Sequence, residues 1–122
     1  ETYASYLNLL ALEFIKAYDL CKKIDYLELA VKIENWIIEN SKNKDIYLIN
    51  KIQIIKRQRK LSKNEKEVLR SISVRNCENN QILCGISILL ENWSDFEFYF
   101  EKLNDEDRKT FMQFPIFDLT KK

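Results

Sequence analysis

The chain of 122 residues contains no histidine and only one glycine and one proline. Histidine is the commonest general base at neutral pH and a frequent zinc ligand, so its absence disfavours catalytic triads and zinc centres. All-β folds and glycine-rich phosphate loops require more glycine than this chain has. The sequence also has no P-loop and no dinucleotide-binding motif. We therefore expect a helical protein that is not an enzyme and that uses no cofactor.

The three cysteines, Cys21, Cys77 and Cys84, are odd in number, and none of them belongs to a C-x-x-C pair. Such a pattern provides neither a disulfide framework nor a closed metal site. The sequence also lacks a signal peptide and any apolar run near the roughly 18 residues that a membrane-spanning helix needs. We therefore expect a cytoplasmic protein that binds no metal ion and does not enter a membrane.

Apolar residues make up 46% of the chain and aromatic residues 12%, which is enough for a packed core. Residue 1 is Glu rather than Met, and an amphipathic pattern is already established at Tyr6. We therefore expect this chain to be the C-terminal part of a longer protein.

One short pattern occurs three times: an apolar residue, then Asp or Ser, two further residues, and Glu. The copies are Ile24–Glu28, Leu61–Glu65 and Trp93–Glu97. In such a capping box the Asp or Ser side chain accepts a hydrogen bond from the amide three residues later, and the Glu reaches back. The pattern predicts helix starts at Asp25, Ser62 and Ser94, which are 37 and 32 residues apart. A recurrence near this spacing is typical of stacked helical hairpins.

Apolar residues recur at helical spacing between these caps and predict an all-α fold. The connection Lys22–Ile24 is so short that the helices on either side must form an antiparallel pair. Residues 46–55 are rich in isoleucine and leave a strand as an alternative, but the flanking helices favour helix. Pro115 ends the last helix, because the residue before a proline is pushed out of the α region. The prediction is one domain over residues 1–122, with hairpins at about 3–39, 45–72 and 80–103 and a capping helix at about 105–114.

The end of the chain, from Phe111 to Phe117, is strongly apolar. It either covers the last hairpin, since terminal repeats need a cap, or contacts a subunit or another domain. Gly85 lies inside a predicted helix, where glycine costs about 1 kcal/mol relative to alanine. Close approach of a neighbouring helix would explain a glycine at that position.

The hairpins resemble tetratricopeptide (TPR) repeats, which are helix pairs of about 34 residues. In the third copy, Leu90–Phe96 resembles the turn of that family, and Trp93 takes its aromatic turn position. Phe100 then matches the aromatic position of the second helix, and Leu103 the small residue near its end. In the first copy, Asp25-Tyr26 fits the turn.

This resemblance covers about residues 10–103 and implies a concave surface that grips a peptide or another domain. Arrays of this family commonly accompany an enzymatic or DNA-binding domain, as in peptide-sensing bacterial regulators. Members that clamp peptides use Asn and Lys or Arg on the first helix of each pair.

A polar stripe on the first helix of the second hairpin is the candidate binding site. Asn50, Gln53 and Arg57 follow at i, i+3 and i+7, and Arg59 and Lys60 lie in the basic connector behind them. Asn and Gln would pair with the backbone amides of an extended peptide, and the connector would meet its acidic residues. We expect a protein- or peptide-interaction scaffold, as the sensor or oligomerisation part of a bacterial regulator or multidomain protein. The partner could also be a second copy of the chain, which would make the protein a homodimer.

Charge is unevenly distributed along the chain. Lys51–Arg70 carries eight Lys or Arg and two Glu, whereas Glu91–Asp118 carries eight acids and three bases. Such runs are either solvated helix faces or partner surfaces. Nucleic-acid binding through residues 51–70 is therefore the alternative function, because these cations could contact several phosphates. A net charge of only +1 and the lack of a base-stacking platform speak against it.

Overall fold

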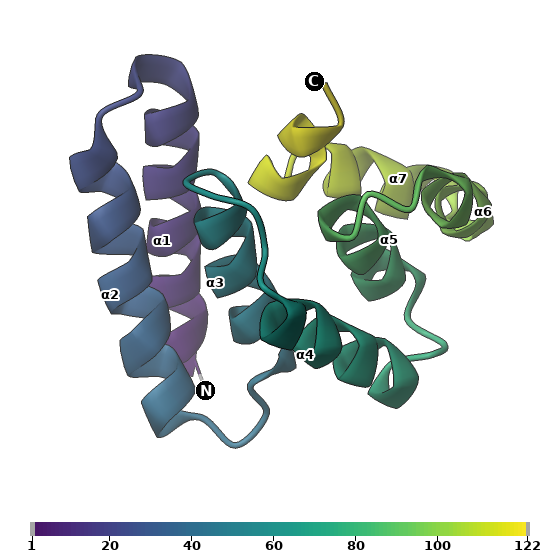
Figure 1. Ribbon diagram of the computed structural model, residues 1–122, viewed down its shortest axis with the longest axis horizontal. Helices are drawn as coiled ribbons and strands as arrows, with labels where there is room; N and C mark the ends of the chain where they lie inside the picture. Colours follow the sequence, from purple (N-terminus) through teal and green to yellow (C-terminus); the bar gives the residue numbers. More distant parts are fainter. Residues whose placement is uncertain (1, 122) are drawn as a thin grey trace. The chain divides into compact units, whose positions relative to one another are not determined.

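A computed structural model describes residues 2–121, and the secondary structure of this part of the chain is all helical, with no strand (Figure 1). It confirms the all-α fold class and selects helix over strand for residues 46–55. The elements are α1 Thr2–Cys21, α2 Ile24–Asn40, α3 Asp45–Lys56, α4 Lys63–Arg75, α5 Asn80–Leu89, α6 Trp93–Lys102, α7 Asp105–Met112 and a 3₁₀ helix, η1 Pro115–Lys121.

The chain divides into two compact units, one ending at Arg59 and the other beginning at Lys60. We call them unit 1, which contains α1 to α3, and unit 2, which contains α4 to η1. The boundary falls inside the predicted hairpin 45–72, so the two helices of that hairpin belong to different units. Each unit has a core of its own and is described by itself.

In unit 1, α1 and α2 form the predicted antiparallel hairpin, and α3 packs against both helices (Figure 1). The chain reverses at Lys22, which adopts a left-handed conformation with φ of 60°. Its amide donates to the carbonyl oxygen of Tyr18 at 2.7 Å and so closes the end of α1. The core consists of fully buried apolar side chains from all three helices: Ala11, Ile15, Leu27, Ala30 and Ile54.

Two of the three predicted helix starts are wrong by two residues. Helix α2 is preceded by Lys23, which makes no side-chain cap bond, so Asp25 lies in the first turn. The left-handed residue at the end of α1 turns the chain before Asp25 is reached, and the aspartate still suits the helix dipole. Helix α6 is capped by Asn92 rather than Ser94, because the Asn92 side chain accepts from the amide of Asp95 at 3.2 Å.

The middle helix start is confirmed in full. Ser62 caps α4 and accepts from the amide of Glu65 at 3.1 Å. The Glu65 carboxylate accepts in return from the Ser62 amide at 2.7 Å. Both hydrogen bonds of a capping box are therefore present.

Unit 2 is built around α5, whose residues from Leu83 to Leu89 are all buried. A Cβ atom added to Gly85 would lie 3.3 Å from Cδ1 of Ile116 in η1, so close approach does account for this glycine. Phe111 is buried, and its ring lies 6.3 Å from that of Phe100 between ring centroids. The apolar chain end thus packs inside its own unit, which agrees with the prediction that it covers the last hairpin. Helix α7 ends before Pro115, as predicted.

Candidate functional site

The predicted polar stripe lies on one face of α3, but this face is directed into unit 1. Asn50 and Gln53 are only 8% and 1% exposed, and the Arg57 side chain only 4%. The Asn50 amide nitrogen donates to Oδ1 of Asn8 on α1 at 2.8 Å, and Gln53 donates to Oδ1 of Asn50 at 3.1 Å. The expectation that these three side chains line an open groove is therefore wrong. Spacing identifies a helix face, but it does not tell whether that face meets solvent or a polar partner.

Arg57 joins α3 to α1 through two parallel hydrogen bonds to the Asp19 carboxylate. Its Nε lies 2.9 Å from Oδ1 and its Nη2 3.0 Å from Oδ2. The remaining nitrogen, Nη1, donates to the backbone and side-chain oxygens of Gln53 at 3.1 and 3.0 Å. Such a planar, two-point pair is the strongest form of salt bridge. Arg57 therefore holds unit 1 together, and its charge is already balanced inside the chain.

Glu34 on α2 is a buried carboxyl that the sequence analysis did not single out. It is 0% exposed, and neither of its carboxylate oxygens has a hydrogen-bond partner among the described residues. Burial raises the pKa of this carboxyl to about 8, and the nearby Asn50 amide offsets only part of that rise. The sequence could have indicated that Glu34 is buried, because it follows Ala30 by four residues and precedes Ile37 by three on the same helix face.

The other two predicted site residues, Arg59 and Lys60, are exposed. They lie on either side of the unit boundary, at the end of unit 1 and the start of unit 2. They follow Arg57 by two and three residues, but unlike the buried stripe of α3 they lie at the surface. Further cations, Lys63, Lys66 and Arg70, are exposed along α4.

An apolar surface covers the side of the α1–α2 hairpin that is turned away from α3. We define the outer hairpin surface as the exposed side chains of Tyr3, Tyr6, Leu10, Leu29 and Trp36. The first three follow one another at i, i+3 and i+7 on α1, and the last two are seven residues apart on α2. The rings of Tyr3 and Trp36 meet edge to face with centroids 5.8 Å apart, so the two helices contribute to one surface.

The contacts of Asn8 show on which side of unit 1 this surface lies. Asn8 bonds to α3, and Tyr6 and Leu10 are each two positions from it along α1. Two positions correspond to more than half a turn on a helix of 3.6 residues per turn, so Tyr6 and Leu10 face away from α3. Tyr6 is 68% exposed and Trp36 44%.

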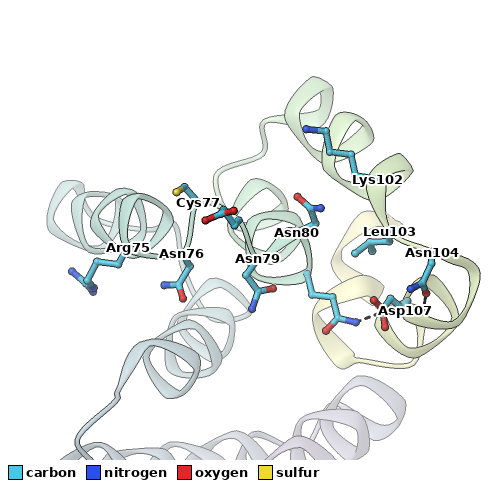
Figure 2. Close-up of a pocket in the computed structure, with 11 residues that line it drawn as sticks. Arg75, Asn76, Cys77, Asn79, Asn80, Lys102, Leu103, Asn104 and Asp107 are labelled. Atoms are coloured by element: carbon cyan, nitrogen blue, oxygen red, sulfur yellow. Dashed lines mark hydrogen bonds between the residues drawn. The ribbon is translucent and has the colours of Figure 1, made fainter.

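A polar cleft of about 650 Å³ opens in unit 2 between the α4–α5 turn and the α6–α7 turn (Figure 2). Five of the eleven residues that line it carry side-chain amides, and we call it the amide cleft. These residues are Asn76, Asn79, Asn80, Gln81 and Asn104. Arg75 and Lys102 also line it, together with Glu78 and Asp107, so its charges balance.

No family model, no curated protein and no solved structure matches this chain. The resemblance to TPR repeats therefore stays a prediction. Within residues 2–121, no three His, Cys, Asp or Glu side chains come together as a metal site would require. No helix in this part of the chain has both the length and the apolar character needed to cross a membrane.

Proposed function

We propose that this chain is a cytoplasmic protein-interaction module that binds its partner through the outer hairpin surface. The observation that carries this proposal is the group of aromatic and aliphatic side chains that α1 and α2 expose together. Contiguous apolar patches on a folded domain mark interaction sites, whereas single exposed apolar residues need no explanation. Acting as the sensor or oligomerisation part of a larger regulator is one form of this function.

The composition of the surface supports recognition of a protein rather than a small molecule. Tyr and Trp dominate the energetics of protein interfaces, because they remove a large apolar area from water and lose little side-chain entropy. Tyr3, Tyr6 and Trp36 provide three such anchors along one hairpin. On its other side, α1 is held against α3 by the Asn8 and Asp19 contacts. A partner therefore meets a surface that needs little reorganisation.

Photo-crosslinking tests this proposal. A crosslinking amino acid at position 6 should capture a partner in cells, and the purified partner should then bind the purified chain. Tyr6→Ser and Trp36→Ser should each weaken that binding by about tenfold or more, as loss of an aromatic anchor does. Leu20→Ser is the matched control, because Leu20 is 89% exposed on the same helix but lies outside the surface.

Two results would count against the outer hairpin surface. The first is a partner whose affinity is unchanged by both serine variants. The second is a partner that crosslinks from position 20 and not from position 6. If the captured partner is a second copy of this chain, sedimentation should show a dimer that the Tyr6→Ser and Trp36→Ser variants dissociate.

Nucleic-acid binding is a second candidate, favoured by one observation on α4. Lys63, Lys66 and Arg70 are all exposed at i, i+3 and i+7, which places three cations on one helix face. If all three contact phosphates of duplex DNA, log K against log salt should have a slope of about −2.7. Replacing them together with Gln should abolish the binding. A salt-independent affinity, or none, would reject this candidate.

A further inference from the structure

The side chains that line the amide cleft of unit 2 disfavour several classes of ligand. No aromatic residue lines it, so it offers no stacking surface for a nucleobase or a sugar ring. Its two cations are balanced by two acids, so it has no net attraction for an anion. Its volume of about 650 Å³ lies within the range of ligand pockets, which runs from about 300 to 1,000 Å³.

The amides are held in fixed orientations by the turns from which they come. Asn79 caps α5, and its Oδ1 accepts from the amide of Ile82 at 3.1 Å. Asn104 caps α7 in the same way, and its Oδ1 accepts from the amide of Asp107 at 2.8 Å. Each cap bond engages the oxygen of the side chain, so the NH₂ group of each of these two cleft-lining residues is left as a donor.

Gln81 differs from these two residues because its amide nitrogen, rather than its oxygen, is engaged in a hydrogen bond. Its Nε2 donates to the backbone oxygen of Asp107 at 3.4 Å, across the cleft from α5 to α7. Its Oε1 is then directed away from that bond as an acceptor. The cleft therefore combines fixed donors from Asn79 and Asn104 with a fixed acceptor from Gln81.

We infer that the amide cleft binds a short extended segment of polypeptide through its backbone. A peptide group presents one N–H donor and one C=O acceptor and carries no charge, which matches the donors, the acceptor and the balanced charge of the cleft. An extended segment has no internal hydrogen bonds, so its backbone groups are available to the side-chain amides. Because three of these amides are already held by cap or cross-cleft bonds, little side-chain freedom is lost on binding.

This inference concerns a site in unit 2 and does not depend on the outer hairpin surface of unit 1. The test uses the complete chain labelled with ¹⁵N and a neutral backbone probe, acetyl-tetra-alanine N-methylamide. The side-chain NH₂ signals of Asn79 and Asn104 should shift saturably as the probe is added, with a dissociation constant in the millimolar range. Added salt should change this affinity little, because neither the probe nor the cleft carries net charge.

The variants Asn79→Asp and Asn104→Asp test the two NH₂ donors without disturbing the fold. Aspartate caps a helix as well as asparagine does, so both variants keep the cap while losing the NH₂ group. Each should lower the affinity for the probe by about three- to tenfold, as loss of one net hydrogen bond does. Asn64→Asp is the control, since it makes the same change at an exposed position of α4, outside the cleft, and should leave the affinity unaltered.

Three outcomes would overturn the inference. One is the absence of any saturable shift with the peptide probe. Another is that inorganic phosphate or glucose shifts these signals and the peptide does not, which would assign the cleft to an anion or a sugar. The last is an unchanged affinity in both Asp variants while circular dichroism shows the native helix content.

Discussion

Among the described residues of unit 1, only Glu34 has buried side-chain oxygens without a hydrogen-bond partner. Its carboxyl is excluded from water, and neither oxygen has a partner in the described part of the chain. Ionising such a group in the interior is far less favourable than ionising it in water. The folded chain therefore keeps Glu34 protonated at neutral pH, as its pKa of about 8 indicates.

Unit 1 should lose stability as the pH rises. The pKa of Glu34 is about 8 in the folded chain and near its ordinary value of 4.5 in the unfolded chain. Below pH 4.5 both states are protonated and the contribution is fully present; between pH 4.5 and 8 the unfolded state alone ionises, so stability falls. Glu34→Gln removes this dependence and should raise the free energy of unfolding at pH 8 by about 4 kcal/mol.

Urea unfolding at pH 5 and pH 8 measures this effect. Trp36 fluorescence reports on unit 1 once Trp93 has been replaced by Phe. Glu39→Gln, an exposed change on the same helix, is the control and should keep the native dependence on pH. The same pH dependence in Glu34→Gln and in the native chain would contradict the assignment.

Arg57 should be needed for stability. Arg57→Ala leaves the Asp19 carboxylate and the Gln53 side chain without their partner, and should lower the free energy of unfolding by about 2–4 kcal/mol. Arg57→Lys should recover only part of this loss, because an ammonium group cannot make two parallel bonds. Urea unfolding followed by Trp36 fluorescence measures both variants. Gln58→Ala, at an exposed neighbour, is the control, and a loss below about 0.5 kcal/mol in Arg57→Ala would refute the internal role.

The sequence predicted which residues of α3 share a face, but not what that face contacts. Asn50, Gln53 and Arg57 have the same spacing whether they meet water or a polar partner. The deciding partners, Asn8 and Asp19, lie 42 and 38 residues earlier on another helix. No local pattern links positions so far apart, so the open groove was predicted where a buried network exists.

At the scale of helices, the sequence places the elements well because helix starts and stops are local. The α5–α6 turn shows where local patterns are not enough to place a helix start. Two overlapping cap patterns occur there, one from Asn92 to Asp95 and one from Ser94 to Glu97. The end of α5 decides between them, because the amide of Asn92 donates to the carbonyl oxygen of Ser87 at 2.9 Å. This bond fixes where the chain leaves α5 and makes Asn92 the cap.

Two serines with the same sequence pattern should therefore differ in their effect on stability. Ser62→Ala removes a complete capping box and should lower the free energy of unfolding by about 1 kcal/mol. Ser94→Ala should cost less than about 0.5 kcal/mol, because Ser94 lies inside α6, accepts no cap bond, and donates only an exposed hydrogen bond to Oδ1 of Asn92 at 3.2 Å. Thermal unfolding of the two variants measures the difference. An equal loss in both would mean that Ser94 also acts as a cap.

At the scale of the whole molecule, the division into two units is the feature that the sequence did not reveal. The helical pattern continues on both sides of Arg59, and nothing in it indicates that α3 and α4 belong to different units. The division depends on contacts between distant residues. Ile54 belongs to a core with α1 and α2, whereas Leu69 and Ile72 of α4 are buried in the unit that contains α5.

Since each unit has its own core, we expect the two to unfold separately. Ile37→Ala removes a fully buried side chain from unit 1, and Phe111→Ala does so in unit 2. Each should cost about 2–5 kcal/mol within its own unit, which accelerates amide hydrogen exchange there about 30-fold or more. Exchange measured residue by residue by NMR should show this acceleration in α1–α3 for the first variant and in α4–α7 for the second, with the other unit unchanged. Equal acceleration in both units by either variant would show instead that the chain unfolds as one cooperative body, and the boundary at Arg59 would then have no energetic meaning.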